Sequence, residues 1–185
     1  MPKYKCGYSI PCNYKEALEF DKRNGNTKWQ DANVLEHGQL SGYKVFKNRG
    51  EFHEGKIPEG YRKIKVHTIF DVKHNGRHKA RVVANGNLMD TPLQSVYSGI
   101  VSFRGLHTCI FLGELNNMTP WAIDIGNAYL EAKTTEKVCI KAGPEFGELQ
   151  GNLPIINKAL YRPRLSGKAF NILLSDCLRD FTSTK

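Results

Sequence analysis

A single carboxylate lies inside a short apolar run of the sequence. Asp124 falls within residues 121–125, whose composition predicts a β-strand, and the dipeptide Gly126-Asn127 after it predicts a turn. A buried carboxylate is costly unless it is hydrogen-bonded, bound to a metal ion or placed at an exposed strand end. Asp124 therefore either caps the turn or binds a metal ion. Mg²⁺ usually takes one or two carboxylates together with substrate phosphates, so the second role requires further ligands. Tyr129 places an aromatic ring close after the carboxylate.

Three cations recur at alternate positions after a strong hairpin signal, Asn75-Gly76. These cations are Arg77, Lys79 and Arg81. A two-residue loop would place Lys79 opposite Val72 and Arg81 opposite Phe70. Because alternate residues of a strand share a face, the cations are expected to form a ridge that suits the binding of phosphates.

The net charge of +9 is concentrated in one part of the chain. Residues 47–81 contain 10 basic and 4 acidic residues, whereas residues 82–185 contain 10 basic and 9 acidic ones. A solvated basic face is one interpretation of this excess, and a phosphate-contacting patch is the other. For the second interpretation, the expected nucleic-acid-binding residues are Arg77, Lys73 and Lys65.

Several function classes are disfavoured by composition. No apolar run approaches the roughly 18 residues of a membrane span, and the N-terminus has no apolar segment typical of a secretory signal. The 5 cysteines are scattered and lack the paired spacing of a zinc site. We therefore expect an intracellular protein, cytoplasmic or nuclear, that is not secreted.

Local signals predict four helices. Asn13 and Thr27 each precede a Glu or Gln by three residues, which predicts capped helices to about Phe20 and to about Leu40. In the second of these helices, Trp29, Ala32 and Leu35 are expected to pack on one face. Ser102 is expected to cap a helix to about residue 116 whose apolar residues, Phe103 and Ile110 among them, point inward. Ser166 is expected to cap the last helix, to about residue 181.

Strands are predicted between these helices. Alternating residues predict an antiparallel hairpin over residues 63–84, and weaker strands are expected at 137–141 and 154–159. Helices and strands alternate irregularly, so the expected fold class is α+β. The expected organisation is an N-terminal helical extension (1–46), a region with the basic hairpin (47–120) and a C-terminal region (121–185).

Five segments then occur in an order that resembles a known family, and the resemblance runs over nearly the full chain. They are Trp29-Gln30-Asp31-Ala32, Lys79-Ala80-Arg81-Val82-Val83-Ala84, Ser95-Val96-Tyr97-Ser98-Gly99, Asp124-Ile125-Gly126-Asn127-Ala128-Tyr129-Leu130 and Lys158-Ala159-Leu160-Tyr161. Together they resemble the N-terminal portion of a copia-type retrotransposon reverse transcriptase domain.

The resemblance implies an incomplete right-hand polymerase fold, with fingers and part of a palm. It implies that Lys79 and Arg81 grip the triphosphate of the incoming nucleotide. It also implies that Asp124 is the first catalytic carboxylate of a site for two Mg²⁺ ions. Tyr129 would pack under the sugar and exclude a 2′-hydroxyl group. The implied partners are an RNA or DNA template-primer and a deoxynucleoside triphosphate, with no membrane.

Two departures from the family bear on activity. The chain contains no Asp-Asp pair and ends at Lys185, whereas the family carries a second carboxylate pair after the last helix. In addition, Arg162-Pro163 follows Tyr161 where the family has a glycine. One carboxylate does not hold two metal ions against their mutual repulsion, so we expect that this chain alone does not extend a primer.

The sequence thus supports a segment of an RNA-directed DNA polymerase from a retrotransposon polyprotein. The alternative is a catalytically inactive remnant that binds nucleic acid non-specifically, and an unrelated globular domain is a third hypothesis. Ile123, Ile125 and part of the last helix are expected to be less covered than in a complete domain, and residues 121–185 are expected to be poorly protected from hydrogen exchange. Self-association through exposed apolar surface is therefore also expected.

Overall fold

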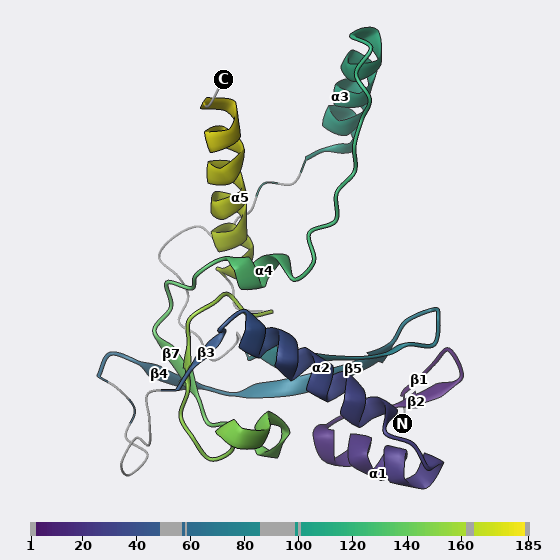
Figure 1. Cartoon of the computed structure of the whole chain (residues 1–185), viewed down its shortest axis with the longest axis vertical. Helices are drawn as coiled ribbons and strands as arrows, with labels where there is room; N and C mark the ends of the chain where they lie inside the picture. Colours follow the sequence, from purple (N-terminus) through teal and green to yellow (C-terminus); the bar gives the residue numbers. More distant parts are fainter. Residues whose placement is uncertain are drawn as a thin grey trace.

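The structure is a computed structural model that describes residues 3–48, 57, 59–85, 99, 101–161 and 165–183. Helices and small sheets are mixed along the chain (Figure 1). The helices are α1 (Tyr14–Asn24), α2 (Lys28–Gly42), α3 (Phe103–Leu115), α4 (Ala128–Glu131), the 3₁₀ helix η3 (Pro144–Leu149) and α5 (Ser166–Ser183). The strands are β1 (Lys3–Lys5), β2 (Tyr8–Ile10), β3 (Phe46–Lys47), β4 (Arg62–Ile64), β5 (Val66–Val72), β6 (His78–Ala84), β7 (Val138–Ile140) and β8 (Ile155–Ile156).

These strands form three sheets. β1 and β2 form an N-terminal hairpin that the sequence did not predict, and β5 and β6 form the long antiparallel hairpin. The third sheet has the order β3-β8-β7-β4, in which β4 and β7 are parallel. The predicted strand from residue 63 therefore divides at Lys65, and its two parts join different sheets.

The register of the β5–β6 hairpin differs from the prediction by one residue. Its loop has three residues, because the Lys73 amide donates to the Arg77 carbonyl oxygen at 3.0 Å and the Gly76 amide donates to the Lys73 carbonyl oxygen at 2.8 Å. Gly76 adopts the left-handed conformation that such loops require, with φ of 77°. Consequently Lys79 lies opposite Asp71 and Arg81 opposite Ile69, on the face away from Phe70 and Val72.

The first predicted helix cap is confirmed. The Glu16 amide donates to Asn13 Oδ1 at 2.9 Å, while the Glu16 carboxylate accepts from the Cys12 amide at 2.7 Å. The helix continues beyond Phe20 to Asn24 and ends at Gly25, which has a left-handed φ of 62°.

The second predicted cap is wrong. Thr27 makes no capping bond, and the first amides of α2 are satisfied by Asp21 of α1. The Trp29 and Gln30 amides donate to this buried carboxylate at 3.1 and 2.8 Å. A tertiary contact thus replaces the local cap, because the tight turn between α1 and α2 brings Asp21 to the start of the second helix.

Two apolar clusters form the core. One lies where α1 and α2 cover the β5–β6 hairpin, and it is centred on Trp29, whose ring packs 5.6 Å from that of Phe70. The other joins the end of α2 to the four-stranded sheet and α4, through Leu40, Ile140 and Leu130. On α2 the buried face runs through Trp29, Ala32, Glu36 and Leu40, so the prediction of a buried Leu35 is wrong.

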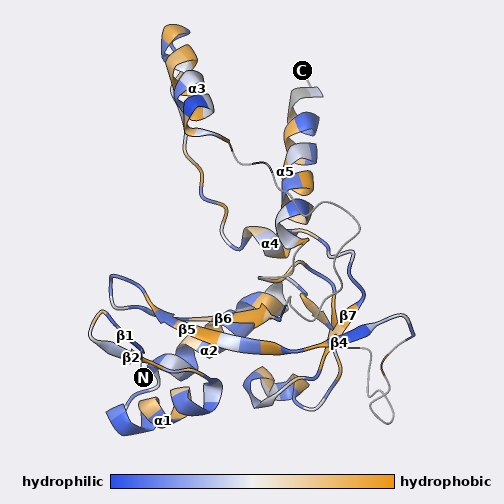
Figure 2. Cartoon of the chain, turned by 180° about the vertical axis from the view of Figure 1, so that it is seen from behind, coloured by the Kyte–Doolittle hydropathy of each residue, from blue (hydrophilic) through white to orange (hydrophobic). Residues whose placement is uncertain are grey.

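Helix α3 begins as predicted but packs differently. The Gly105 amide donates to Ser102 Oγ at 3.1 Å, which confirms the cap. None of its residues is buried, however, and the inward face expected for Phe103 and Ile110 is wrong. Figure 1 shows α3 projecting from the body on the same side as α5. Figure 2 shows apolar colour on α3 where no other described element covers it.

Residues 121–125 form no strand, which corrects the prediction. Trp121 and Ile123 are 87% and 84% exposed. A strand exists only where another strand pairs with it, and no described strand lies beside this segment. Ile123 and Ile125 are 84% and 42% exposed, in agreement with the low cover expected for them. Residues 128–160 nevertheless contribute Leu130, Ile140 and Leu160 to the core.

The remaining predicted elements are close to the observed ones. β7 and β8 are shorter than the segments expected at 137–141 and 154–159. Ser166 is the first residue of α5 rather than its cap, and the helix is partly covered near Phe170 but exposed at Phe181. No helix among the described residues has the length and apolar character needed to span a membrane.

Candidate functional site

A cleft of about 620 Å³ lies between α2, the β5–β6 hairpin and the start of α4. It gathers chemistry-bearing side chains from four separate parts of the chain. Its polar lining residues are Glu36, Gln39, Lys73, Arg77, His78, Lys79, Arg81, Asp124, Asn127, Tyr129 and Tyr161. The cleft therefore unites Asp124, Lys79, Arg81 and Tyr129, the residues for which the family resemblance implies nucleotide chemistry.

The cationic wall of the cleft comes from β6 and its loop. Lys79 and Arg81 alternate along this strand, so they share one face. Arg77, directly before the strand, and Lys73, on the other side of the loop, add two charges to the lining. Burial, followed by repulsion from Arg81 and Lys73, lowers the pKa of Lys79. Such a group of like charges is relieved when an anion binds among them.

Beneath this wall lies a carboxylate that sequence reasoning missed. Glu36 is 6% exposed, and its Oε1 accepts a hydrogen bond from the Val82 amide at 3.1 Å. Val82 is on β6, and α2 packs along this strand. The Val82 amide therefore donates to a side chain of the helix, where a neighbouring strand would otherwise supply the acceptor. Burial raises the pKa of Glu36, against the lowering effects of the Val82 bond and of Lys79 and Arg81.

A sequence signal for Glu36 did exist. It follows Trp29 and Ala32 at helical spacing, on the face that the two apolar residues identified as buried. A carboxylate on a buried face needs a partner, and an unpaired edge of a strand is one source of such a partner.

An aromatic cluster holds the far side of the cleft. The Arg81 guanidinium lies 5.7 Å from the ring centroid of Tyr161, within cation–π range. The Tyr161 hydroxyl donates to Asn127 Oδ1 at 3.3 Å, and the Tyr129 ring packs 5.9 Å from that of Tyr161. The centroids of the Tyr129 and Phe170 rings are 6.3 Å apart, so α5, which carries Phe170, helps to orient Tyr129. Burial, followed by the nearby Glu36 charge, raises the pKa of Tyr161.

Asp124 lies in the exposed segment before α4 and lines the cleft. No hydrogen bond from another described residue reaches its carboxylate, and α4 has no side-chain cap, so the turn-capping alternative receives no support. In the described part of the chain, no three His, Cys, Asp or Glu side chains come together to hold a metal ion. Glu36 accepts from the Val82 amide, which leaves Asp124 as the one free carboxylate among the described residues of the lining. The described residues therefore do not fit a two-metal site.

The remaining predicted site residues divide into two groups. Lys73 and Arg77 reach the cleft, whereas Lys65 lies at the junction of β4 and β5 and is not part of its lining. Arg162-Pro163 and most of the Ser95 to Gly99 motif lie outside the described residues.

The sequence is similar to parts of known transposon proteins. Over 157 residues, which are 83% of the chain, it is 32% identical to the Transposon Ty1-DR4 Gag-Pol polyprotein of Saccharomyces cerevisiae. The Ty1-LR2 and TyH3 Gag-Pol polyproteins of the same yeast match over the same length at the same identity. The chain is homologous to a segment of a transposon Gag-Pol polyprotein.

The match covers 10% of the Ty1-DR4 polyprotein and 9% of the other two, so the chain spans about a tenth of these relatives. No protein-family profile matches the chain, and no solved structure matches it. The expected resemblance to a retrotransposon protein is therefore confirmed. Which domain of Gag-Pol the chain corresponds to, and what activity it has, are proposed below.

Proposed function

We propose that the chain is a segment of an RNA-directed DNA polymerase from a copia-type retrotransposon polyprotein, and that its cleft binds the phosphates of a nucleotide. The observation that carries this proposal is the meeting of Lys79, Arg81, Asp124 and Tyr129 in one cleft. These four residues belong to two separate motifs of the family resemblance, and chance gives no reason for both motifs to line the same cleft.

The side chains supply complementary chemistry. Lys79 and Arg81 offer charge-assisted donors to phosphate oxygens, and the contact with Tyr161 orients the Arg81 guanidinium. Tyr129, 37% exposed, presents its ring at the same cleft, where it can contact a sugar and exclude an added 2′-hydroxyl group. Asp124 adds one carboxylate, which suits a share in binding Mg²⁺ together with substrate phosphates.

Primer extension is not expected of this chain alone. Clamping both the attacking and the leaving oxygen of an in-line displacement takes two metal ions. The described cleft offers one free carboxylate for them. The proposed role of the chain is therefore to bind and orient the nucleotide.

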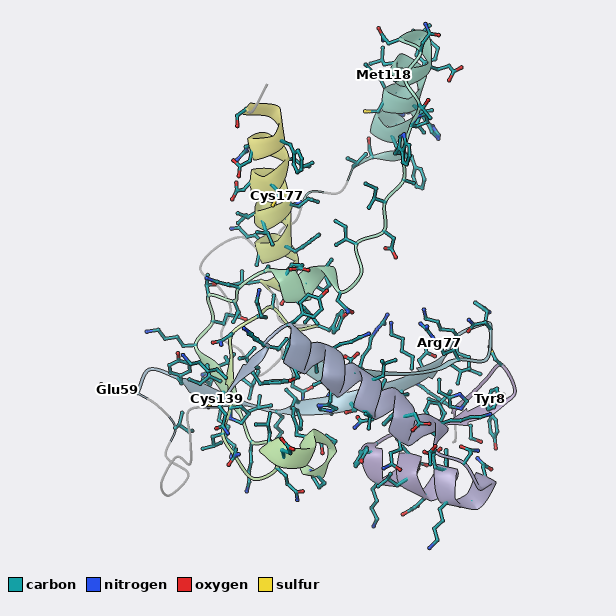
Figure 3. All side chains as sticks on the ribbon, viewed as in Figure 1. Tyr8, Glu59, Arg77, Met118, Cys139 and Cys177 are labelled. Carbon is teal, nitrogen blue, oxygen red and sulfur yellow. The ribbon has the colours of Figure 1, made fainter. Side chains whose placement is uncertain are left out.

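A second candidate function is sequence-independent binding of nucleic acid by a catalytically inactive remnant. The observation that favours it is the exposure of Lys73 and Arg77 at the tip of the β5–β6 hairpin, beyond the aromatic part of the cleft. Figure 3 shows Arg77 at this end of the body. Such cations contact phosphates without reading bases.

The test is equilibrium binding of a fluorescent deoxynucleoside triphosphate, with Mg²⁺, to the chain and to two charge-reversal variants. Lys79→Glu and Arg81→Glu should each weaken binding about tenfold to a hundredfold, because a hydrogen bond to a charged group contributes about 1.5–3 kcal/mol. Lys15→Glu is the matched control, since it makes the same charge change at the start of α1, where a negative charge is tolerated.

Equal nucleotide affinity of the Lys79→Glu variant and the unaltered chain would contradict the proposal. If the unaltered chain binds oligonucleotides but no nucleotide, the remnant function is favoured. A primer-extension assay on the same samples checks the expected lack of catalysis, and incorporation abolished by Asp124→Ala would overturn that expectation.

A further inference from the structure

A second basic pocket, separate from the cleft, lies at the other end of α4. It has a volume of about 550 Å³, and four lysines from three parts of the chain line it, together with two threonines. These residues are Lys44, Lys133, Thr134, Thr135, Lys137 and Lys158. We call this site the lysine pocket, and the five motifs of the family resemblance include none of its first five members.

The backbone beneath the lysine pocket is fixed by the four-stranded sheet. The Thr134 amide donates to the Asn157 carbonyl oxygen at 3.1 Å, and the Asn157 amide donates to that of Val45 at 2.8 Å. The Arg62 amide donates to the Lys137 carbonyl oxygen at 2.9 Å. Four segments distant in the sequence are thus held together, so the fold brings Lys44 and Lys158 to the two lysines of residues 133–137.

The positive charge of the lysine pocket is poorly compensated. The Lys158 ammonium group donates to the Glu131 carbonyl oxygen at 2.8 Å, and within the described ranges no carboxylate forms an ion pair with Lys44, Lys133 or Lys137. Glu136 lines the same pocket, so one carboxylate faces four lysines. The pocket therefore favours an anionic ligand.

Lys44 has a left-handed backbone conformation, which is unfavourable for a residue with a Cβ atom. It follows the end of α2 with a left-handed φ of 54°, at a position where helices usually carry glycine or asparagine. The sequence places Gly42 two residues earlier instead. The chain therefore holds a lysine, at some cost in backbone energy, where its charge joins the pocket.

We propose that the lysine pocket binds the sugar–phosphate backbone of nucleic acid without reading its bases. Lys and Thr, with Tyr61 and Asn157 in the same lining, are the donors that typically contact phosphates in nucleic-acid complexes. The inference rests on the proposed function for its choice of nucleic acid as the ligand.

The position of the lysine pocket supports a second contact on the same strand of nucleic acid. Tyr129 of α4 lines the cleft, and Lys133 lies just beyond the end of the same helix. Tyr61 closely follows Glu59, which Figure 3 shows at the end of the body opposite to Arg77. A strand that reaches both sites gains affinity because its second contact becomes intramolecular.

The experiment measures binding of the full chain to a fluorescent DNA duplex of random sequence across a range of salt concentrations. Lys133→Gln combined with Lys137→Gln should lower the slope of log K against log salt by about 2, because each phosphate contact contributes about 0.9. Lys15→Gln combined with Lys22→Gln, on α1, is the control, because it removes the same number of charges outside the pocket. This variant should change the salt slope much less than the pocket variant does.

Lys44→Gly separates binding from folding. Glycine tolerates the left-handed conformation, so the variant should keep its melting temperature while its affinity for the duplex falls. Nucleotide binding at the cleft should be unchanged in all these variants, because none of the altered residues lines it.

Three outcomes overturn the inference. They are an unchanged salt slope and affinity in the pocket variants, a lack of duplex binding by the unaltered chain, and binding of inorganic tripolyphosphate in the pocket without binding of DNA. The proposed function fails separately, if duplex binding depends on the lysine pocket while no nucleotide binds at the cleft.

Discussion

Glu36 links α2 to β6, the strand that carries Lys79 and Arg81 of the cationic wall. It accepts a hydrogen bond from the Val82 amide, and Lys79 and Arg81 act on its charge from the same strand. A buried carboxylate under two cations ties the position of β6 to α2. The geometry of the phosphate-binding wall therefore depends on a side chain that contacts no phosphate.

We predict that Glu36→Ala destabilises the protein by about 1–3 kcal/mol, because the Val82 amide loses its acceptor in a buried place. Glu36→Gln keeps an acceptor oxygen and should cost less. Urea denaturation of the two variants at neutral pH measures the difference. Equal destabilisation by Ala and Gln would show that the charge of Glu36, rather than its hydrogen bond, is what matters.

The pKa of Glu36 also predicts a dependence on pH. Burial raises this pKa in the folded state above the ordinary value of 4.5, so ionisation is harder in the folded than in the unfolded chain. Relative to Glu36→Gln, the natural protein is therefore most stable below the ordinary pKa and loses that advantage as pH rises through the folded value. Denaturation curves from about pH 4 to about pH 8, which bracket the ordinary pKa, check this sign. An advantage that grows with pH would contradict it.

At the scale of elements, the β5–β6 hairpin depends on one glycine. Gly76 has a φ of 77° in a three-residue loop, and its register places Lys79 and Arg81 on the face away from Phe70. A shift by one residue would exchange the two faces of the hairpin. The cationic ridge and the core that Trp29 forms with Phe70 are thus set by the same turn.

We predict that Gly76→Ala destabilises the protein by about 1–2 kcal/mol, because the left-handed conformation is unfavourable for a residue with a Cβ atom. A Cβ atom at position 76 would lie 4.0 Å from the Tyr8 hydroxyl oxygen, an ordinary van der Waals contact, so the effect is one of backbone conformation and not of collision. Gly38→Ala is the matched control. It lies in the middle of α2 with free space around it and should stabilise the protein by about 0.5–1 kcal/mol. Thermal melts of both variants test the pair, and equal shifts would refute the role of the turn.

On the scale of the whole molecule, two parts differ in how far their apolar side chains are buried. The members of the two apolar clusters come from described residues between Ile10 and Ala84 and between Leu130 and Leu160. Helix α3 and the segment 121–125 lie outside those clusters, and Phe111, Trp121 and Ile123 are mainly exposed. Exposed apolar surface of this kind favours association.

Hydrogen exchange should show this difference directly. We predict slow exchange in β5, β6 and β7 and fast exchange over residues 101–127, because an isolated helix of 13 residues is marginal in water. Protection of α3 that grows with protein concentration would indicate self-association through its apolar face. Slow exchange of α3 in a dilute monomer would mean that the core closes over this helix.

Local features of the protein are determined by the sequence alone. The caps at Asn13 and Ser102 and the buried–exposed alternation of β5 depend on neighbours within a few residues, so they could be predicted. The same holds for the motifs that pointed to Lys79, Arg81, Asp124 and Tyr129. These residues needed a known family to acquire a role, and their meeting in one cleft needed the fold.

Only the tertiary structure decided the features that depend on which distant segments meet. Asp21 caps the start of α2, Glu36 accepts a hydrogen bond from the edge of β6, and the Tyr161 ring packs against the Arg81 guanidinium. No local sequence pattern predicts these three contacts. Residues 121–125 have the composition of a strand but no described strand beside them, so they form no strand and remain exposed. The physical reason is common to all four cases: a buried charge, an aromatic face and a strand edge each require a partner, and the fold alone supplies or withholds it.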